Sequence, residues 1–284
     1  QSLERIRQDG YAYVDKTREI YRLTSKGKYY FLGRPRRFGK SLLLSTLEAY
    51  YSGRRDLFRG LYIDTVEKEW EVHPILHLDL NTANYKEPDS LDAVLHNSLT
   101  EWEKLYGAEP SETTAPLRFK GIVERAAKLT GQKTVILIDE YDKPLLQTMG
   151  VNEELNERYR NTLKAFYSVI KTCDQYIRFA FLTGVTKFSK ISIFSDLNNL
   201  RDISMEKQYA GICGITQTEL ETNFQPEIQI LADEQEMDYQ QALADLKQWY
   251  DGYRFHPAGV GLYNPFSVLT DFPKKEIRSS WFTT

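Results

Sequence analysis

The sequence has 284 residues, which is enough for one large domain or two modest ones. Its 41% hydrophobic and 27% charged residues are ordinary for a soluble globular protein. The formal net charge of −3 argues against binding nucleic acid through overall charge and leaves only a local basic patch open. No apolar run reaches the roughly 18 residues of a membrane span, so no membrane partner is expected.

The two cysteines, Cys173 and Cys213, lie far apart and show no metal or disulfide spacing. We therefore expect neither a disulfide framework nor a zinc site, and we expect a reducing, cytoplasmic location. The chain begins at Gln1 rather than Met and ends on RSSWFTT without a clear stop. This leads us to expect a piece of a longer protein, followed by a further C-terminal domain.

Apolar periodicity and turn residues predict a regular alternation of strands and helices. In chain order, the predicted elements are a strand over 29–32, a helix over 41–51, a strand over 74–80, a helix over 89–107, a helix over 117–129, a strand over 134–140, a helix over 153–173, a strand over 178–184 and a candidate fifth strand over 207–213. This alternation predicts parallel pairing and a three-layer α/β sandwich. Continuously apolar strands, such as 135–138, indicate a sheet covered on both faces.

The pattern changes after residue 214. Thr216 and Glu219 have the spacing of a capping box that opens a helix, and a second helix ends at Gly252. The stretch WYDGYRF (249–255) is interpreted as a packed aromatic corner. We predict an ATPase-type domain over 1–214 and a small, mostly helical lid over 215–284.

The stretch YYFLGRPRRFGKSLLLSTLEAYYSG (29–53) nearly matches a phosphate-binding loop between a strand and a helix. Gly39, Lys40 and Ser41 fit the usual Gly-x-x-x-x-Gly-Lys-Ser/Thr pattern, but Arg34 stands in the place of the first glycine. In such a loop the lysine reaches the β- and γ-phosphates and the serine ligates Mg²⁺. The start of the helix also attracts anions through its unpaired N–H groups.

The missing glycine is tolerable if Arg34 takes an ordinary negative φ and Pro35 shapes the turn. We predict that geometry, with the amides of residues 36–41 wrapped around the phosphates. Arg36 and Arg37 would add positive charge beside them. The alternative is a basic, solvated turn without a ligand.

A second element supports the nucleotide site. The strand TVILIDE (134–140) ends in Asp139 and Glu140. A phosphate-binding loop needs a carboxylate at the end of a neighbouring strand to hold the metal, and Asp139 is the candidate. Glu140 is the candidate for polarising the attacking water, which predicts an Mg²⁺-dependent ATPase. The alternative is a solvated strand end.

Further polar residues follow the next strand. Thr183 is placed to touch the γ-phosphate or the water, or else it simply caps the strand end. Lys187, Arg201 and Arg254 are either cations for the γ-phosphate, in cis or from a neighbouring subunit, or ordinary surface charges.

Several long stretches together resemble the bacterial AAA-ATPase-like family. These are GYAYVDKTREIYRL, YYFLGRPRRFGKSLLLSTLEAYY, VILIDEYDKPL, RFAFLTGVTKFSKISIFSDLNNLRDIS and WYDGYRF…YNPFSVL, from about residue 11 to 269. The resemblance implies an AAA+/signal-transduction P-loop fold with strand order 5-1-4-3-2 and a helical lid. It also implies that Arg34 belongs to the family's own form of the loop and that residues 13–17 contact the base or order the loop. The nucleotide-binding run that it implies is Arg34, Pro35, Arg36, Arg37, Phe38, Gly39, Lys40, Ser41 and Leu42.

Relatives of this family commonly carry a C-terminal nuclease-like domain of the PD-(D/E)XK type, and its acid-acid-lysine constellation is not found before Thr284. The main hypothesis is an ATPase that uses ATP and Mg²⁺, with Glu140, Lys40 and Thr183 as catalytic residues and Ser41 and Asp139 at the metal. The first alternative is a nucleotide-dependent switch with little hydrolysis, which a homo-oligomer would complete or which would regulate a nuclease-like domain. The second is a small-molecule phosphotransferase, and the third is a protein that handles nucleic acid. The absence of an Asn-Lys-x-Asp motif favours ATP over GTP.

Overall fold

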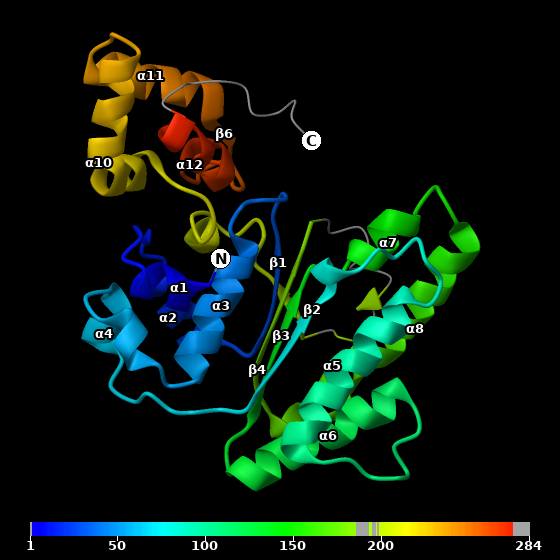
Figure 1. Ribbon diagram of the computed structural model, residues 1–284. Coiled ribbons are helices and arrows are strands. Elements are labelled where there is room, and N and C mark those ends of the chain that lie inside the picture. The colour runs from blue at the N-terminus through cyan, green and yellow to red at the C-terminus, as the bar shows by residue number, and fades with distance from the viewer. Residues whose placement is uncertain (1, 186–192, 195–196, 198, 275–284) are drawn as a thin grey trace.

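The computed structural model describes residues 2–185, 193–194, 197 and 199–274. At its centre is a five-stranded sheet in the order β2-β3-β4-β1-β5, with every neighbouring pair parallel (Figure 1). The strands are β1 (Tyr29–Gly33), β2 (Ile75–Asp79), β3 (Thr134–Asp139), β4 (Ile177–Gly184) and β5 (Arg201–Asp202). The predicted α/β sandwich is confirmed, and so is the strand order that the family resemblance implied.

The prediction of a fifth strand over 207–213 is wrong. The fifth strand is Arg201–Asp202, which pairs with β1, whereas Lys207–Tyr209 forms a 3₁₀ helix. Tyr209, Ile212 and Cys213 are buried because this irregular segment packs against the core. An apolar run does not distinguish a strand from another buried segment when alternation is absent.

Helices cover both faces of the sheet and lie on opposite sides of it in Figure 1. On one side are α1 (Leu3–Gln8), α2 (Thr17–Lys26), α3 (Lys40–Tyr51) and α4 (Tyr62–Val66). On the other are α5 (Ser90–Tyr106), α6 (Ala115–Thr130) and α8 (Glu153–Thr172), while the short α7 (Lys143–Thr148) follows the end of β3. Each strand sends alternate side chains to the two sides. In β1, for example, Tyr29 and Phe31 join the core under α5, α6 and α8, whereas Tyr30 and Leu32 join the core under α2 and α3.

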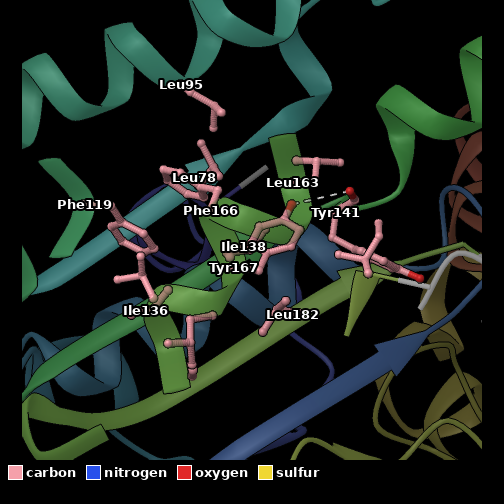
Figure 2. Close-up of a cluster of buried hydrophobic side chains, with 14 of the residues drawn as sticks. Leu78, Leu95, Phe119, Ile136, Ile138, Tyr141, Leu163, Phe166, Tyr167 and Leu182 are labelled. Carbon is pink, nitrogen blue, oxygen red and sulfur yellow. Dashed lines mark hydrogen bonds between the residues drawn. The ribbon is translucent and has the colours of Figure 1, made fainter. Parts of the chain in front are cut away.

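The core under α5, α6 and α8 is rich in aromatic residues (Figure 2). Phe119 of α6 stacks on Phe166 of α8 with ring centroids 4.3 Å apart and planes 4° apart. Ile136 and Ile138 of β3 and Leu78 of β2 belong to the same buried cluster. These contacts fix the two helices against the sheet, because apolar side chains at helical spacing gain most from burial on one face.

The C-terminal segment (residues 215–274) has a hydrophobic cluster of its own. It contains α10 (Gln217–Glu234), α11 (Tyr239–Tyr250), α12 (Pro265–Lys274) and a small antiparallel hairpin of β6 (Asp251–Tyr253) and β7 (Leu262–Tyr263), which the sequence did not indicate. The predicted capping box is confirmed: the Glu219 amide donates to Thr216 Oγ1, and the Thr216 amide donates to Glu219 Oε1. In Figure 1 these helices lie beyond the end of the sheet at which β1 joins α3.

Within the described residues, no helix combines the length and the hydrophobicity that crossing a membrane requires.

Replacing Phe166 with Ala is expected to lower the free energy of unfolding by about 3–5 kcal/mol, because it empties a ring-sized volume in a closed core and removes the stack on Phe119. Urea titration measures the change. Leu105→Ala on α5 is the control, since Leu105 is 70% exposed and should change stability by no more than about 0.5 kcal/mol. Equal effects of the two substitutions would contradict this packing.

Candidate functional site

The strand order determines where the candidate residues meet. Strand β4 lies between β1 and β3, so the carboxyl ends of these three strands are adjacent. In the register, Leu32 of β1 pairs with Thr183 of β4, and Ile138 of β3 pairs with Leu182. The loop after β1 and the acids at the end of β3 therefore flank Thr183. This edge is where ligands bind in open parallel sheets.

The loop over residues 34–39 joins β1 to α3. Gly39 caps the helix with φ +91°, and Arg37 has φ +61°, so two residues of the loop are left-handed. Left-handed residues set between others curl the backbone so that neighbouring amides point toward one anion. Arg34 is not among the residues with positive φ, as predicted. The chain thus passes the missing glycine without backbone strain at that position.

Lys40 begins α3 and is only 3% exposed. Its ammonium group donates to the carbonyls of Arg34 (3.0 Å) and Pro35 (2.9 Å) across the loop. The same nitrogen lies 3.0 Å from Oε1 of Glu140, forming a nearly buried ion pair. The lysine therefore connects the loop to Glu140, the acid directly after β3.

Asp139 accepts two hydroxyl hydrogen bonds, one on each carboxylate oxygen. Ser41 Oγ donates to Oδ2 and Thr183 Oγ1 donates to Oδ1, both at 2.6 Å. The amide of Glu140 donates in turn to Thr183 Oγ1 at 3.2 Å. Residues from α3, β3 and β4 that are far apart in the sequence are thereby joined in one hydrogen-bonded line.

Glu140 has a left-handed backbone with φ +54°, which is a strained conformation for a residue other than glycine. The turn is held by the Tyr141 amide, which donates to the Thr183 carbonyl at 2.9 Å. Burial raises the pKa of Glu140, and the nearby charge of Lys40 opposes that rise. A carboxylate with a raised pKa is a stronger base than an ordinary surface glutamate.

The side chain of Arg34 points into the protein and is 1% exposed. Its guanidinium donates to the carbonyls of Gly33 (2.9 Å), Ser204 (2.7 Å) and Tyr209 (3.2 Å). The ring of Phe255 covers it, with 3.8 Å between the guanidinium carbon and the ring centroid. Burial lowers the pKa of this arginine to about 10. Arg34 therefore ties the loop to the chain beyond β5, and its side chain is buried against that segment.

Two more loop residues contact the C-terminal part of the chain. Phe38 is fully buried and meets the rings of Tyr253 (4.8 Å) and Phe255 (5.4 Å) edge to face. Arg37 is exposed, and its guanidinium lies over the ring of Phe266 in α12 at 4.1 Å. The loop and the C-terminal segment are thus packed directly on each other, which no pattern in the sequence indicated.

The other sequence candidates are dispersed. Arg36 is exposed on the loop, and Leu42 is half-buried in the first turn of α3. Arg201 is paired with Glu206 at 2.7 Å on the edge strand, and Arg254 is exposed after β6. Lys187 lies outside the described residues.

A cavity of about 380 Å³ opens beside the loop. Its walls come from the N-terminal strap (residues 11–14), the start of α3 including Gly39 and Leu42, residues 212–215, and helices α10 and α12. Most of the lining is apolar. The strap includes Tyr13 and Val14, which the resemblance placed near the base or the loop. The cavity is therefore enclosed jointly by the sheet domain and the C-terminal segment.

The residues at the strand ends fit a magnesium ion. Ser41 and Asp139 offer a hydroxyl and a carboxylate side by side, and Mg²⁺ takes hard oxygen ligands from one or two side chains, phosphates and water. In the part of the chain that the structure describes, no group of three or more His, Cys, Asp or Glu side chains is arranged to hold a metal. A magnesium ion here would draw its remaining ligands from a nucleotide and water.

Sequence reasoning missed two residues near this site. Asp142 is fully buried and accepts from the Val185 amide at 3.1 Å, so it shapes the turn after β4. Phe255 covers Arg34. The acid-rich end of β3 was the signal in the sequence for Asp142. Nothing in the sequence indicated that Phe255, in the aromatic corner, packs on Arg34.

A family model described as a predicted AAA-ATPase matches residues 1–194, which include the loop, both acids and Thr183. The chain belongs to this predicted AAA-ATPase family. Membership supports a general ATPase-like role and nucleotide binding.

A relative of this chain from Azotobacter chroococcum mcd 1 is 39% identical over 288 residues and is named "Uncharacterized protein in vnfD 5'region". The match covers all of this chain and 53% of the relative, so the chain spans about half the length of the curated relative it matches. No solved structure matches the chain.

Replacing Arg34 with Gly would restore the usual glycine pattern, but it is expected to destabilise this protein by at least about 3 kcal/mol. The substitution removes several hydrogen bonds from a charged group and leaves their carbonyls buried. Thermal unfolding and urea titration measure the loss. Arg36→Gly, in the same loop but exposed, is the matched control and should stay within about 1 kcal/mol. An Arg34→Gly protein as stable as the control would show that the buried guanidinium is not needed.

Proposed function

We propose that this protein binds ATP with Mg²⁺, hydrolyses it, and couples the cycle to movement of its C-terminal segment as a lid. The observation that carries the proposal is the hydrogen-bonded line of Ser41, Asp139 and Thr183 beside the Lys40–Glu140 pair. These side chains have the chemistry that phosphoryl transfer to water needs, namely a cation, hard oxygen ligands and a carboxylate base. The division at residue 214 is part of the proposal.

Phosphates would be held by the curled amides of residues 36–41, by the start of α3 and by Lys40. Ser41 and Asp139 would hold the metal, which neutralises charge on the phosphates when bound. Thr183 fixes the orientation of Asp139 and of the Glu140 amide, so it sets the direction of both acids. Glu140 would polarise the attacking water.

The Lys40–Glu140 ion pair gives this site a resting arrangement. While the pair is closed, the ammonium group neutralises the carboxylate that would act on water. When phosphates attract the Lys40 ammonium group, its electrostatic attraction to Glu140 weakens. The Glu140 carboxylate is then released from the ion pair. The carboxylate thus becomes a base mainly when there is a nucleotide to hydrolyse.

The base would enter the apolar cavity beside the loop, which has the volume of a small-molecule site. The sequence carries no guanine-reading Asn-Lys-x-Asp motif, which supports ATP over GTP. Both the loop and α12 border this cavity, so a bound nucleotide would touch the proposed lid as well as the sheet domain.

The second candidate function is a nucleotide-dependent switch with little intrinsic hydrolysis. The closed Lys40–Glu140 pair favours it, and so does the pairing of Arg201 with Glu206, which leaves that arginine engaged elsewhere. A homo-oligomer would then supply an arginine from a neighbouring subunit. Single-turnover hydrolysis measured against protein concentration separates the two: a rate independent of concentration supports hydrolysis by a monomer.

The setting of this activity is also a proposal. The relative is about twice as long, which supports a further domain, such as a nuclease-like one, that the nucleotide cycle would regulate. Contact with nucleic acid would follow from such a domain. Cys173 and Cys213 are both free and buried, which suits a reducing, cytoplasmic location.

Replacing Glu140 with Gln is expected to lower the ATP hydrolysis rate by about a hundredfold or more while nucleotide binding persists, because the amide cannot accept a proton from water. Phosphate release and calorimetric titration measure the two properties. Glu154→Gln, an exposed change on α8, is the control, and Lys40→Ala should weaken binding itself. Equal hydrolysis by the Glu140→Gln and wild-type proteins would reject the assigned base.

Replacing Phe38 with Leu is expected to uncouple the loop from the C-terminal segment, because it removes two edge-to-face contacts and keeps an apolar side chain in place. Amide hydrogen exchange in α10–α12, with and without Mg²⁺ and nucleotide, measures the coupling. In the wild type, nucleotide should slow exchange there, and the variant should lose at least half of this protection. Phe58→Leu, also fully buried but packed on Trp70, should keep it. Full nucleotide-dependent protection in Phe38→Leu would refute the coupling route.

A further inference from the structure

One ion pair joins the N-terminal part of the chain to the C-terminal segment. Lys16 Nζ lies 2.7 Å from Oε1 and 2.6 Å from Oε2 of Glu219, although the two residues are 203 positions apart in the sequence. The side chain of Lys16 is 13% exposed and that of Glu219 is 22% exposed. A pair that engages both carboxylate oxygens and is mostly shielded from water is stronger than an ordinary surface pair.

Each partner is fixed to its own part of the protein. Lys16 directly precedes α2, and the neighbouring Asp15 accepts a hydrogen bond from the Tyr62 amide of α4 at 2.8 Å. Glu219 lies in the first turn of α10, where its Oε1 atom also accepts from the Thr216 amide at 3.1 Å. The ion pair therefore connects two anchored elements, one in the sheet domain and one in the C-terminal segment.

The strap beside this pair forms part of the wall of the cavity that opens beside the loop. Tyr13 of the strap packs on the core of the sheet domain, whereas Val14 packs on the hydrophobic cluster of the C-terminal segment. Lys16 lines this cavity together with the strap, and residues of α10 and α12 line it as well. The ion pair thus joins two walls of the cavity, the strap side and the α10 side.

The pair also has room to separate. Lys16 and Glu219 both line a second cavity, which has a volume of about 400 Å³. Glu19 of α2 lines this second cavity too, and it interacts electrostatically with both partners, attracting Lys16 and repelling Glu219. Open space and a competing acid beside the pair make its separation easier than that of a pair in a closed core.

We propose that the Lys16–Glu219 pair is a latch that controls the rate at which nucleotide enters and leaves the cavity beside the loop. The inference rests on the proposed nucleotide-binding function and assigns Lys16 and Glu219 as positioning residues of that site. While the latch is closed, α10 is held against the strap side, and a base passes between these walls more readily when the latch opens. The latch closes with or without nucleotide, so it slows entry and release alike and leaves the affinity nearly unchanged.

The test measures association and dissociation rates of ADP that carries a fluorescent N-methylanthraniloyl group on its ribose, with Mg²⁺ present. Lys16→Met removes the charge and keeps an unbranched side chain. It should raise both rates about tenfold, as expected for the loss of charged hydrogen bonds, and change the Kd by less than about threefold. Lys16→Arg keeps a cation and should retain the slow rates.

Glu219→Gln tests the other half of the latch, and it also serves if Lys16→Met fails to fold. The glutamine removes the charge but keeps an acceptor for the capping box, so this variant should raise both rates as Lys16→Met does. The double variant Lys16→Met/Glu219→Gln should be no faster than either single variant, because all three lose the same contact. Multiplied accelerations in the double variant would contradict the latch.

Controls separate the latch from the proposed function. Lys26→Met, at an exposed lysine in the last turn of the same helix α2, should leave both rates as in wild type. Unchanged rates in both Lys16→Met and Glu219→Gln overturn the latch alone. So does faster release without faster entry, because that is a loss of affinity. Absence of ADP binding to the wild type, or binding that Lys40→Ala leaves unchanged, overturns both the latch and the proposed function.

Discussion

The buried guanidinium of Arg34 is the contact on which the arrangement of the site depends. Taking a charge out of water is expensive, and here it is compensated by backbone carbonyls and an aromatic ring rather than by a carboxylate. Breaking these hydrogen bonds would leave both the buried guanidinium charge and the backbone carbonyls without partners. The loop is consequently held in one position relative to the segment beyond β5. Where such loops usually have a glycine with a permissive backbone, this loop has Arg34, whose side chain holds the loop in position.

The loop also contacts the C-terminal segment through side chains other than Arg34. Phe38 and Arg37 extend the contact to β6 and α12, so the side chains of three of the six residues between Gly33 and Lys40 pack on aromatic rings of the C-terminal segment. The Arg34 amide donates to the Gly184 carbonyl at 3.0 Å, so the main chain of this residue joins the loop to β4 while its side chain joins it to the segment beyond β5. The loop and the C-terminal segment are therefore in direct side-chain contact, which is the route by which the proposed coupling would act.

The sequence predicted the parts of this protein that follow strict spacing rules. Strands covered on both faces, the Lys40–Ser41 pair and the two acids at and after the end of β3 each need particular residues at particular positions, so they are visible in one sequence. The fifth strand was misplaced because burial alone does not specify an extended backbone. The direction of Arg34 was not predictable either, because an irregular loop has no period from which a side chain's orientation can be inferred. Apart from the neighbouring Gly33 carbonyl, the partners of the Arg34 and Phe38 side chains lie more than 160 residues away in the chain.

Arg34 binds the segment over 204–210 through main-chain carbonyls, which every amino acid supplies. The side chains of that segment are therefore not selected by this contact, and other contacts constrain them: Ser204 Oγ accepts from the Gly33 amide at 2.8 Å, and Tyr209 is fully buried in the core. Gly214 is different, because a Cβ there would come within 2.5 Å of the Phe38 ring. For the contact itself, side-chain identity matters at Arg34, Phe38 and Gly214, whereas Ser204 and Tyr209 contribute only main-chain carbonyls to it.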